Sequence, residues 1–242
     1  MIFAIADLHL SFGRAKPMDV FAGWADHIPR LEKNWRAVVA PGDTVVLPGD
    51  ISWGMSLEEA LPDFQFLHDL PGTKIIMKGN HDYWWNSRKK TEALWAAHGL
   101  NSLRLLHNNA FLVENFALCG SRGWFFDCEE PGAETSKIVL REAGRVRASI
   151  QAGKQLLAGS NENLLVFLHY PPIVNNQACA EILDALISEG VTRCYYGHLH
   201  GQSIKWAYRG EYEGIQFALV SADALGFGPK RLTSPDPPGR PN

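Results

Sequence analysis

Several short clusters in this chain are built from aspartate, histidine and asparagine, and each directly follows an apolar run. Imidazole nitrogens and carboxylate or amide oxygens are donor atoms that suit divalent transition metals. Any one of these residues alone would more often be a hydrogen-bonded core or turn residue. Repetition of the pattern indicates a metal centre. In chain order the clusters are Asp7-Leu8-His9, Gly49-Asp50, Gly79-Asn80-His81-Asp82, the single His169, and Gly197-His198-Leu199-His200.

The clusters carry more donor atoms than one metal ion uses. A structural zinc site takes four protein ligands, and a catalytic zinc site takes three. Seven donors suit two divalent ions that share a bridging carboxylate and leave positions open for water and substrate. Such a pair holds the attacking and leaving oxygens of an in-line displacement at phosphorus. The seven predicted ligands are Asp7, His9, Asp50, Asn80, His169, His198 and His200.

The runs before the clusters, IFAIA, TVVLP, TKIIMK, LLVFL and TRCYY, predict buried strands. In a parallel-type sheet the ends of such strands meet at one edge, where ligands bind. Glycines at 49, 79 and 197 permit sharp turns from strand to loop. A two-metal mechanism needs no protein nucleophile, and the sequence contains no G-x-S-x-G elbow and no paired Cys/His motif.

Strands and helices alternate along the first hundred residues. Strands at 2–6, 44–47 and 73–77 are separated by segments with helical spacing at 27–39, 56–69 and 86–97. A hairpin at 111–120, a long helix at 134–158, a strand at 163–168, a helix at 178–188 and a strand at 192–196 follow. Residues 203–221 predict a closing antiparallel pair. The pattern predicts an α/β fold with mixed sheets and helices outside.

Length and composition favour one large domain, over residues 1–230, in a chain of 242 residues. The Pro-rich segment 231–242 predicts a disordered tail.

A formal net charge of −3 provides no electrostatic footprint for nucleic acid. No apolar run approaches the roughly 20 residues that span a bilayer, and no signal peptide is evident. The four cysteines include no C-x-x-C pair, which favours a reduced, cytoplasmic protein.

In their order, DLH, GD, GNHD, a lone His and GHLH resemble the motifs of the calcineurin-like metallophosphoesterase superfamily, over residues 7–200. The resemblance implies a four-layer α/β/β/α sandwich of two mixed sheets, with a dinuclear site at the C-terminal edge of the sheets. It implies that His81 binds no metal and instead stabilises charge or protonates the leaving oxygen. It also implies a first metal held by Asp7, His9 and His200, a second held by Asn80, His169 and His198, and Asp50 as the bridge.

Two motifs depart from well-known branches of this superfamily. Its protein Ser/Thr phosphatases carry Asp-Arg-Gly in the second motif and Glu after Asn-His in the third, where this chain has Asp50-Ile51-Ser52-Trp53 and Asn80-His81-Asp82. Its lipid-A precursor hydrolases usually have Arg at the position of His81. The chain looks closer to a bacterial branch of predicted phosphohydrolases marked by Gly-Asp-Ile-Ser-Trp and Gly-Asn-His-Asp-Tyr-Trp-Trp.

Residues beside the clusters are candidates for substrate binding. Arg122 follows a predicted strand, and its guanidinium suits phosphate oxygens, although a structural ion pair is an equal alternative. The rings of Trp53, Tyr83 and Trp84 flank the metal loops and could stack a nucleobase, whereas Trp85 favours core packing. A basic stripe on the long helix is predicted to be a solvated face, paired with Glu134 or Glu142. Its members are Lys137, Arg141 and Arg145.

The sequence therefore predicts a metal-dependent phosphoric ester hydrolase with a metal-bridging hydroxide as nucleophile. Mn, Fe and Zn all suit the donors, and Mn²⁺ is the preferred expectation. Small phosphodiesters or nucleotides are the preferred substrates, with no membrane partner. One alternative is a nuclease of the same superfamily, which the weak charge disfavours. Another is a catalytically silent metal-binding scaffold, which the complete ligand set disfavours.

Overall fold

The computed structural model describes residues 1–124 and 133–233, and these contain two large mixed sheets. The first sheet places four strands in parallel with a fifth antiparallel at its edge. In spatial order its strands are β13 (Lys230–Arg231), β1 (Ile2–Ala4), β2 (Thr44–Leu47), β3 (Thr73–Ile76) and β4 (Leu103–Leu105).

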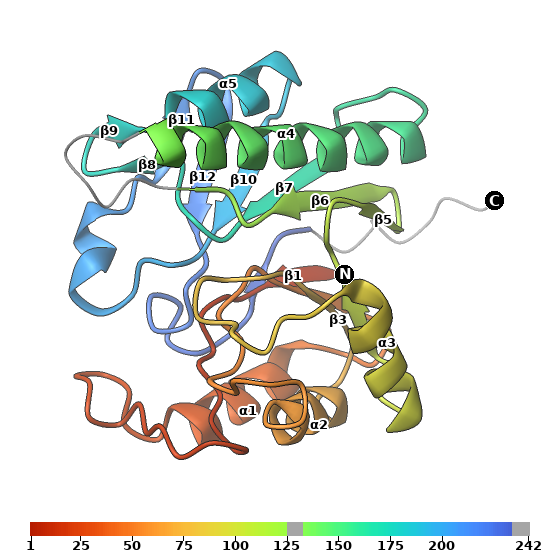
Figure 1. Cartoon of the computed structure of the whole chain (residues 1–242), viewed down its shortest axis with the longest axis vertical. Helices are drawn as coiled ribbons and strands as arrows, with labels where there is room; N and C mark the ends of the chain where they lie inside the picture. The colour runs from red at the N-terminus through yellow and green to blue at the C-terminus, as the bar shows by residue number, and fades with distance from the viewer. Residues whose placement is uncertain (125–132, 234–242) are drawn as a thin grey trace.

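Three helices cover the outer face of this sheet (Figure 1). They are α1 (His27–Val38), α2 (Leu61–Asp69) and α3 (Arg88–Ala97). Helices α1 and α2 present buried apolar side chains at helical spacing, such as Leu31 and Trp35 on α1 and Phe64 and Leu67 on α2. These side chains and the strands form one apolar core. Burial of this stripe holds the helices against the sheet, since helix propensity alone stabilises short helices weakly.

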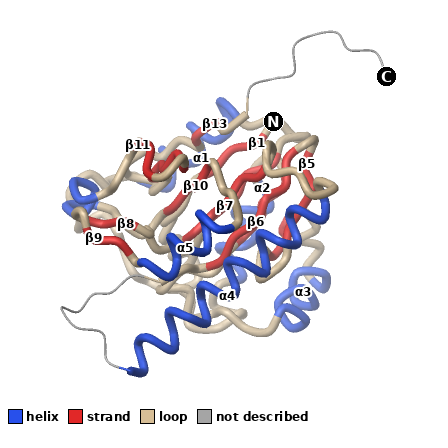
Figure 2. Tube along the Cα trace, turned by 90° about the horizontal axis from the view of Figure 1, so that it is seen from above, coloured by secondary structure: helices blue, strands red, loops and turns tan. Residues whose placement is uncertain are grey.

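The second sheet has four parallel strands between two antiparallel edges. Helices α4 (Ala133–Leu156) and α5 (Ala180–Ser188) cover its outer face (Figure 2). In spatial order its strands are β11 (Gly210–Tyr212), β12 (Ile215–Leu219), β10 (Arg193–Tyr196), β7 (Leu164–Leu168), β6 (Phe116–Ser121) and β5 (Ala110–Val113).

A third apolar cluster lies between the two sheets and joins them. Ile2, Val46 and Ile75 come from the first sheet, and Leu165 and Phe167 come from the second. Strands of both sheets are therefore buried on two faces, which explains why they read as continuous apolar runs. From one side of the molecule to the other, the layers are helices, the first sheet, the second sheet and helices (Figure 1). The predicted α/β class with two mixed sheets is confirmed.

Several local predictions differ from the structure. Residues 201–206 form a short 3₁₀ helix, η1 (Gly201–Trp206), whereas a strand was predicted from residue 203. The backbone N–H of Gly201 donates to the Asp223 carboxylate at 2.6 Å, which favours a turn at this point. Helix α2 begins at Leu61, because Pro62 suits a first helical turn and the residues before it form turns.

Some short elements carried no clear sequence signal. They are β4, β13 and a small hairpin of β8 (Ile173–Val174) and β9 (Gln177–Ala178). Arg231, the first residue of the predicted tail, pairs with Phe3 in the first sheet. The rest of that predicted tail, from residue 234 on, lies outside the described residues. Among the described helices, none combines the length and apolarity that a membrane crossing requires.

Candidate metal centre

The ends of parallel strands from both sheets bring the predicted ligands together. The segments that follow β1 and β2 remain side by side. Asp7 N–H donates to Gly49 O, and His9 N–H donates to Asp50 O, both at 3.0 Å. The second sheet is tied to the first by the backbone N–H of His198, which donates to the Asp7 carboxylate at 2.9 Å. Loops that lie far apart in the sequence thus meet at one edge.

Four of the seven predicted ligands have a left-handed backbone, which is uncommon for residues other than glycine. The φ angles are 57° at Asp7, 48° at His9, 54° at Asp50 and 70° at His198. Each such residue costs on the order of 1–3 kcal/mol and persists only where the surrounding structure enforces it. Strain of this kind concentrates at functional sites, so its occurrence at these residues supports a shared function.

The glycines that precede the ligands are explained mainly by close packing. A Cβ atom on Gly79 would lie 2.1 Å from Asp50 Oδ1, and one on Gly197 would lie 2.6 Å from the Ala6 Cβ. Neither has a positive φ. Gly49 has both constraints, with a φ of 93° and a Cβ position 2.7 Å from His169 Nδ1. The expectation of sharp turns therefore holds at Gly49, whereas Gly79 and Gly197 provide space.

Replacing Gly79 by alanine should damage the site and the fold together. The added methyl would displace the Asp50 carboxylate, and overpacking of this kind costs about 1–3 kcal/mol. Gly144→Ala, on an open part of α4 where nothing lies within 4 Å, is the matched control and should stabilise the protein by about 0.5–1 kcal/mol. Denaturant unfolding of the metal-free proteins and metal analysis measure both effects. Equal stability of the two variants would contradict the packing argument.

Asp7, His9 and Asp50 form a buried group whose donor atoms all lie within 4.8 Å of one another. Two buried atoms in it have no hydrogen-bond partner among the described residues: His9 Nε2 and Asp50 Oδ2, which are 3.9 Å apart. Burial raises the pKa of Asp7 well above its ordinary value, and the nearby Asp50 charge adds to this. Burial also lowers the pKa of His9 well below its ordinary value. A bound cation would compensate both effects.

Asn80, His169 and His198 form a second group around one amide oxygen. Asn80 Oδ1 lies 2.6 Å from His169 Nε2 and 2.9 Å from His198 Nδ1. His169 Nδ1 lies 2.9 Å from the carbonyl oxygen of Pro48, which only accepts, so the ring donates through Nδ1. Burial lowers the pKa of His169 to about 3, so Nε2 carries a lone pair. Two lone pairs this close together repel each other unless both point at one cation.

Asp50 lies between the two groups. Its Oδ2 is 3.9 Å from His9 Nε2 on one side and 3.6 Å from His169 Nε2 on the other. Its Oδ1 accepts the backbone N–H of His81 at 2.7 Å. His200 lies next to His9, with ring centroids 5.0 Å apart. The structure thus brings all seven predicted ligands together, and their nitrogen and oxygen donors fit divalent transition metals.

Asp82 organises the loops that hold these ligands. Its buried carboxylate accepts backbone N–H groups from Gly79, Asp50 and Ile51 at 2.7–2.9 Å, and the indole N–H of Trp84 at 2.9 Å. A single side chain therefore ties the GNHD loop to the loop after β2. Residues that orient metal ligands in this way typically affect metal affinity or activity by about 10–100-fold.

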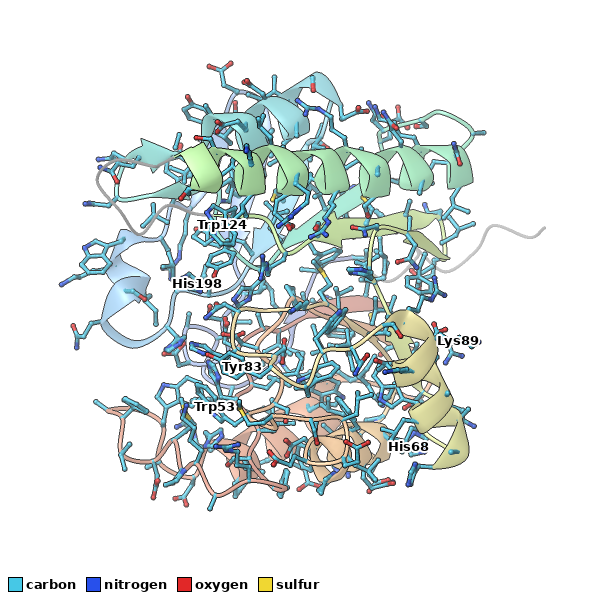
Figure 3. The ribbon with its side chains drawn as sticks, in the orientation of Figure 1. Trp53, His68, Tyr83, Lys89, Trp124 and His198 are labelled. Atoms are coloured by element: carbon cyan, nitrogen blue, oxygen red, sulfur yellow. The ribbon has the colours of Figure 1, made fainter. Side chains whose placement is uncertain are left out.

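His81 and two of the predicted rings lie beside the metal ligands. Trp53 stacks on His9, with centroids 4.8 Å apart, and its centroid lies 4.8 Å from that of His81. Tyr83 is 54% exposed, and its hydroxyl lies 3.5 Å from His81 Nδ1. In the view of Figure 3, Trp53 and Tyr83 lie below His198 and Trp124, in one column on the side away from α3. The ammonium of Lys16, a residue with no sequence signal for this site, lies 3.1 Å from the centre of the Trp53 ring.

Trp84 does not face this site. It is 1% exposed, packs edge-to-face on Phe64, and donates its indole N–H to Asp82. We therefore assign it to the core and not to a substrate wall. Trp85 packs partly against the same core, as predicted.

Arg122 forms the predicted structural ion pair and remains partly exposed. Its guanidinium lies 3.9 Å from the buried Glu142 carboxylate, yet its side chain is 23% exposed. Arg145 also pairs with Glu142, as predicted for the basic stripe, and its side chain is 39% exposed. The Glu134 side chain lies outside the described residues. The meeting of Arg122 with this pair on α4 was not predicted, because the sequence places Arg122 on a separate element.

Comparison with known proteins identifies the family. Residues 1–202 match the family model for calcineurin-like phosphoesterases. The chain belongs to this family. The predicted class, a metal-dependent phosphoric ester hydrolase, is therefore confirmed.

Individual relatives of this calcineurin-like phosphoesterase are distant. Gene 66 protein of Mycobacterium phage L5 is 36% identical over 78 residues, which make up 32% of this chain and only 37% of that protein. The fold resembles phosphopantetheinyl hydrolase (PptH) from Mycobacterium tuberculosis, with a TM-score of 0.52, 15% identity, and coverage of 100% of this chain and 98% of that chain. It also resembles TT1561 of Thermus thermophilus, with a TM-score of 0.50, 14% identity, and coverage of 82% and 81%. At these identities the structural likeness shows the fold alone.

Proposed function

We propose that this chain is a dinuclear phosphoesterase that hydrolyses small phosphodiesters or nucleotides. The position of Asp50 Oδ2 is the main support. This buried oxygen has no hydrogen-bond partner in the described part of the chain. It lies 3.9 Å from His9 Nε2 and 3.6 Å from His169 Nε2, so one carboxylate is close to both donor groups. A single site would leave one of these two groups of buried donors without a cation.

The residues divide into two ligand sets joined by Asp50. We assign Asp7, His9 and His200 to a first divalent cation and Asn80, His169 and His198 to a second. When bound, the two cations supply charge neutralisation at phosphorus and make an attacking water more acidic. Mn²⁺ is the preferred expectation, and Fe and Zn also fit the donors.

Neighbouring residues hold the ligands and the reacting groups in place. The Pro48 carbonyl selects the His169 tautomer that presents Nε2. The Asp82 carboxylate holds the loops that carry Asp50 and Asn80. His81 follows Asn80 on the same loop, with its half-buried ring between Trp53 and Tyr83. We propose that His81 stabilises charge on the phosphate or gives a proton to the leaving oxygen.

A panel of phosphate esters tests this function. The chelated protein is loaded with Mn²⁺, and hydrolysis is measured for monoesters, for nucleotide and aryl diesters, and for single-stranded oligonucleotides. A phosphopantetheinyl ester belongs in the panel, because one protein of similar fold is named for hydrolysing that group. We expect metal-dependent hydrolysis of small diesters or nucleotides in preference to oligonucleotides. Preference for oligonucleotides would instead favour the nuclease, and failure to hydrolyse any ester would favour the silent scaffold.

A further inference from the structure

A cavity of about 270 Å³ lies beside the proposed metal centre. Lys78, which contributes to its wall, lies one residue before the Gly79-Asn80 turn. Arg122, on another wall, accepts the backbone N–H of His169 at its carbonyl oxygen, at 3.1 Å. The cavity has room for roughly nine waters, which also accommodates one phosphate or carboxylate group. Its walls are thus continuous with the segments that hold the second ligand set.

The charges around this cavity are unbalanced. Lys78, Arg122 and Arg145 contribute three cations, and Glu142 is the one carboxylate among the described lining residues. Glu142 is 1% exposed, and its carboxylate is already engaged by Arg145, by the hydroxyl of Ser121 and, at 3.9 Å, by Arg122. One buried carboxylate therefore faces a surplus of positive charge, which favours an anion in the cavity.

Lys78 is the cation whose charge is least compensated by the described residues around it. Among the described residues it makes no hydrogen bond and no ion pair, although it is only partly exposed. Arg122 and Arg145 keep exposed fractions of 23% and 39%. The three cations are therefore reachable from solvent, while Glu142 beneath them is not. A purely structural ion cluster would not need the third cation.

We propose that this cavity binds a second anionic group of the ester substrate, a phosphate or a carboxylate that lies a short distance from the scissile phosphorus. The inference rests on the proposed function, since it concerns the substrate of the same site. Guanidinium and ammonium groups form charge-assisted hydrogen bonds with such oxygens, and Arg122 offers a bidentate fork. The substrate class is therefore a diester or nucleotide that carries a further negative charge.

Two esters that differ in one group test the proposal. Both are 4-nitrophenyl alkyl phosphodiesters of equal chain length, one ending in a phosphate and the other in a methyl group, examined over a series of lengths. In the Mn²⁺-loaded wild type we expect kcat/KM to favour the phosphate-ended ester by about tenfold or more at the best length. Lys78→Met should bring this ratio towards one, and Lys78→Arg should retain most of it. Arg145→Gln is a second test should Lys78→Met fail to fold.

Lys89→Met is the matched control, because it removes the same charge from the exposed surface of α3 (Figure 3). It should keep the wild-type ratio. Equal kcat/KM for both esters in the wild type would overturn the proposal while leaving the proposed function intact. If no ester is hydrolysed, the proposed function fails, and the ratio of the two dissociation constants by calorimetry still tests the cavity.

Inorganic phosphate distinguishes a free ion from a substrate group as the source of the anion. Binding of inorganic phosphate that Lys78→Met weakens, together with no preference between the esters, would overturn the assignment to the substrate. Weakened phosphate binding together with the expected ester preference would support it.

Discussion

Asp50→Asn should remove both metal ions and nearly all hydrolytic activity. The asparagine keeps the size of the side chain and can keep the oxygen that accepts the His81 N–H at 2.7 Å. It replaces the charged Oδ2, which faces His9 and His169, by an amide group. Since residues that merely orient ligands change activity by about 10–100-fold, loss of a bridging ligand should exceed about a hundredfold.

Asp43→Asn is the matched control for this change. Asp43 is another buried carboxylate, and it binds the N-terminal ammonium at 2.7 Å, away from the ligands. It should keep the metal content of the wild type. Metal analysis of the purified variants, with kcat on an aryl diester, measures both properties. If Asp50→Asn retained one ion at full occupancy, Asp50 would belong to one site only.

His81→Ala should keep both metal ions and lose rate. Its link to Asp50 is made by the backbone N–H, which alanine retains, so the ligand loop should stay in place. The ring itself lies beside Trp53 and Tyr83, next to the metal ligands. General acid–base catalysis typically contributes about 10²–10⁴-fold. We expect a loss of this size on esters with poor leaving groups and a smaller loss on 4-nitrophenyl esters.

His68→Ala is the control for this variant. His68 lies on α2, away from the site, and its Nδ1 lies 2.9 Å from the Ser102 hydroxyl (Figure 3). Its kcat should match the wild type on every ester. Loss of a metal ion in His81→Ala would show that His81 is a ligand. Equal losses on good and poor leaving groups would argue against proton transfer to the leaving oxygen.

The grouping of the seven candidate ligands was predictable because these residues lie in short contiguous motifs. Asp7 and His9, or Asn80 and His81, are separated by at most one residue and follow strands that read as apolar runs. Parallel strands then bring these motifs to one edge without any further information. The glycine at position 79 was visible in the sequence, but its reason, the 2.1 Å approach to Asp50 Oδ1, needed the structure.

Side chains whose role depends on tertiary packing were not predictable. Trp53 and Trp84 both lie next to a metal loop, yet one stacks on His9 and the other on Phe64 in the core. Periodicity cannot separate them, because both belong to short irregular segments. The cavity could not be predicted for the same reason, since Lys78 and Arg145 line a common space only because α4 packs over the second sheet. Likewise, η1 depends on Asp223, which is 22 residues from Gly201.

Anomalous diffraction from crystals grown with Mn²⁺ is the most direct test of a dinuclear centre. Data collected at the manganese absorption edge locate the ions without reference to activity. We predict two peaks on either side of Asp50 Oδ2, one among Asp7, His9 and His200 and the other among Asn80, His169 and His198. A single peak at full occupancy, or two peaks that do not share Asp50, would contradict the account.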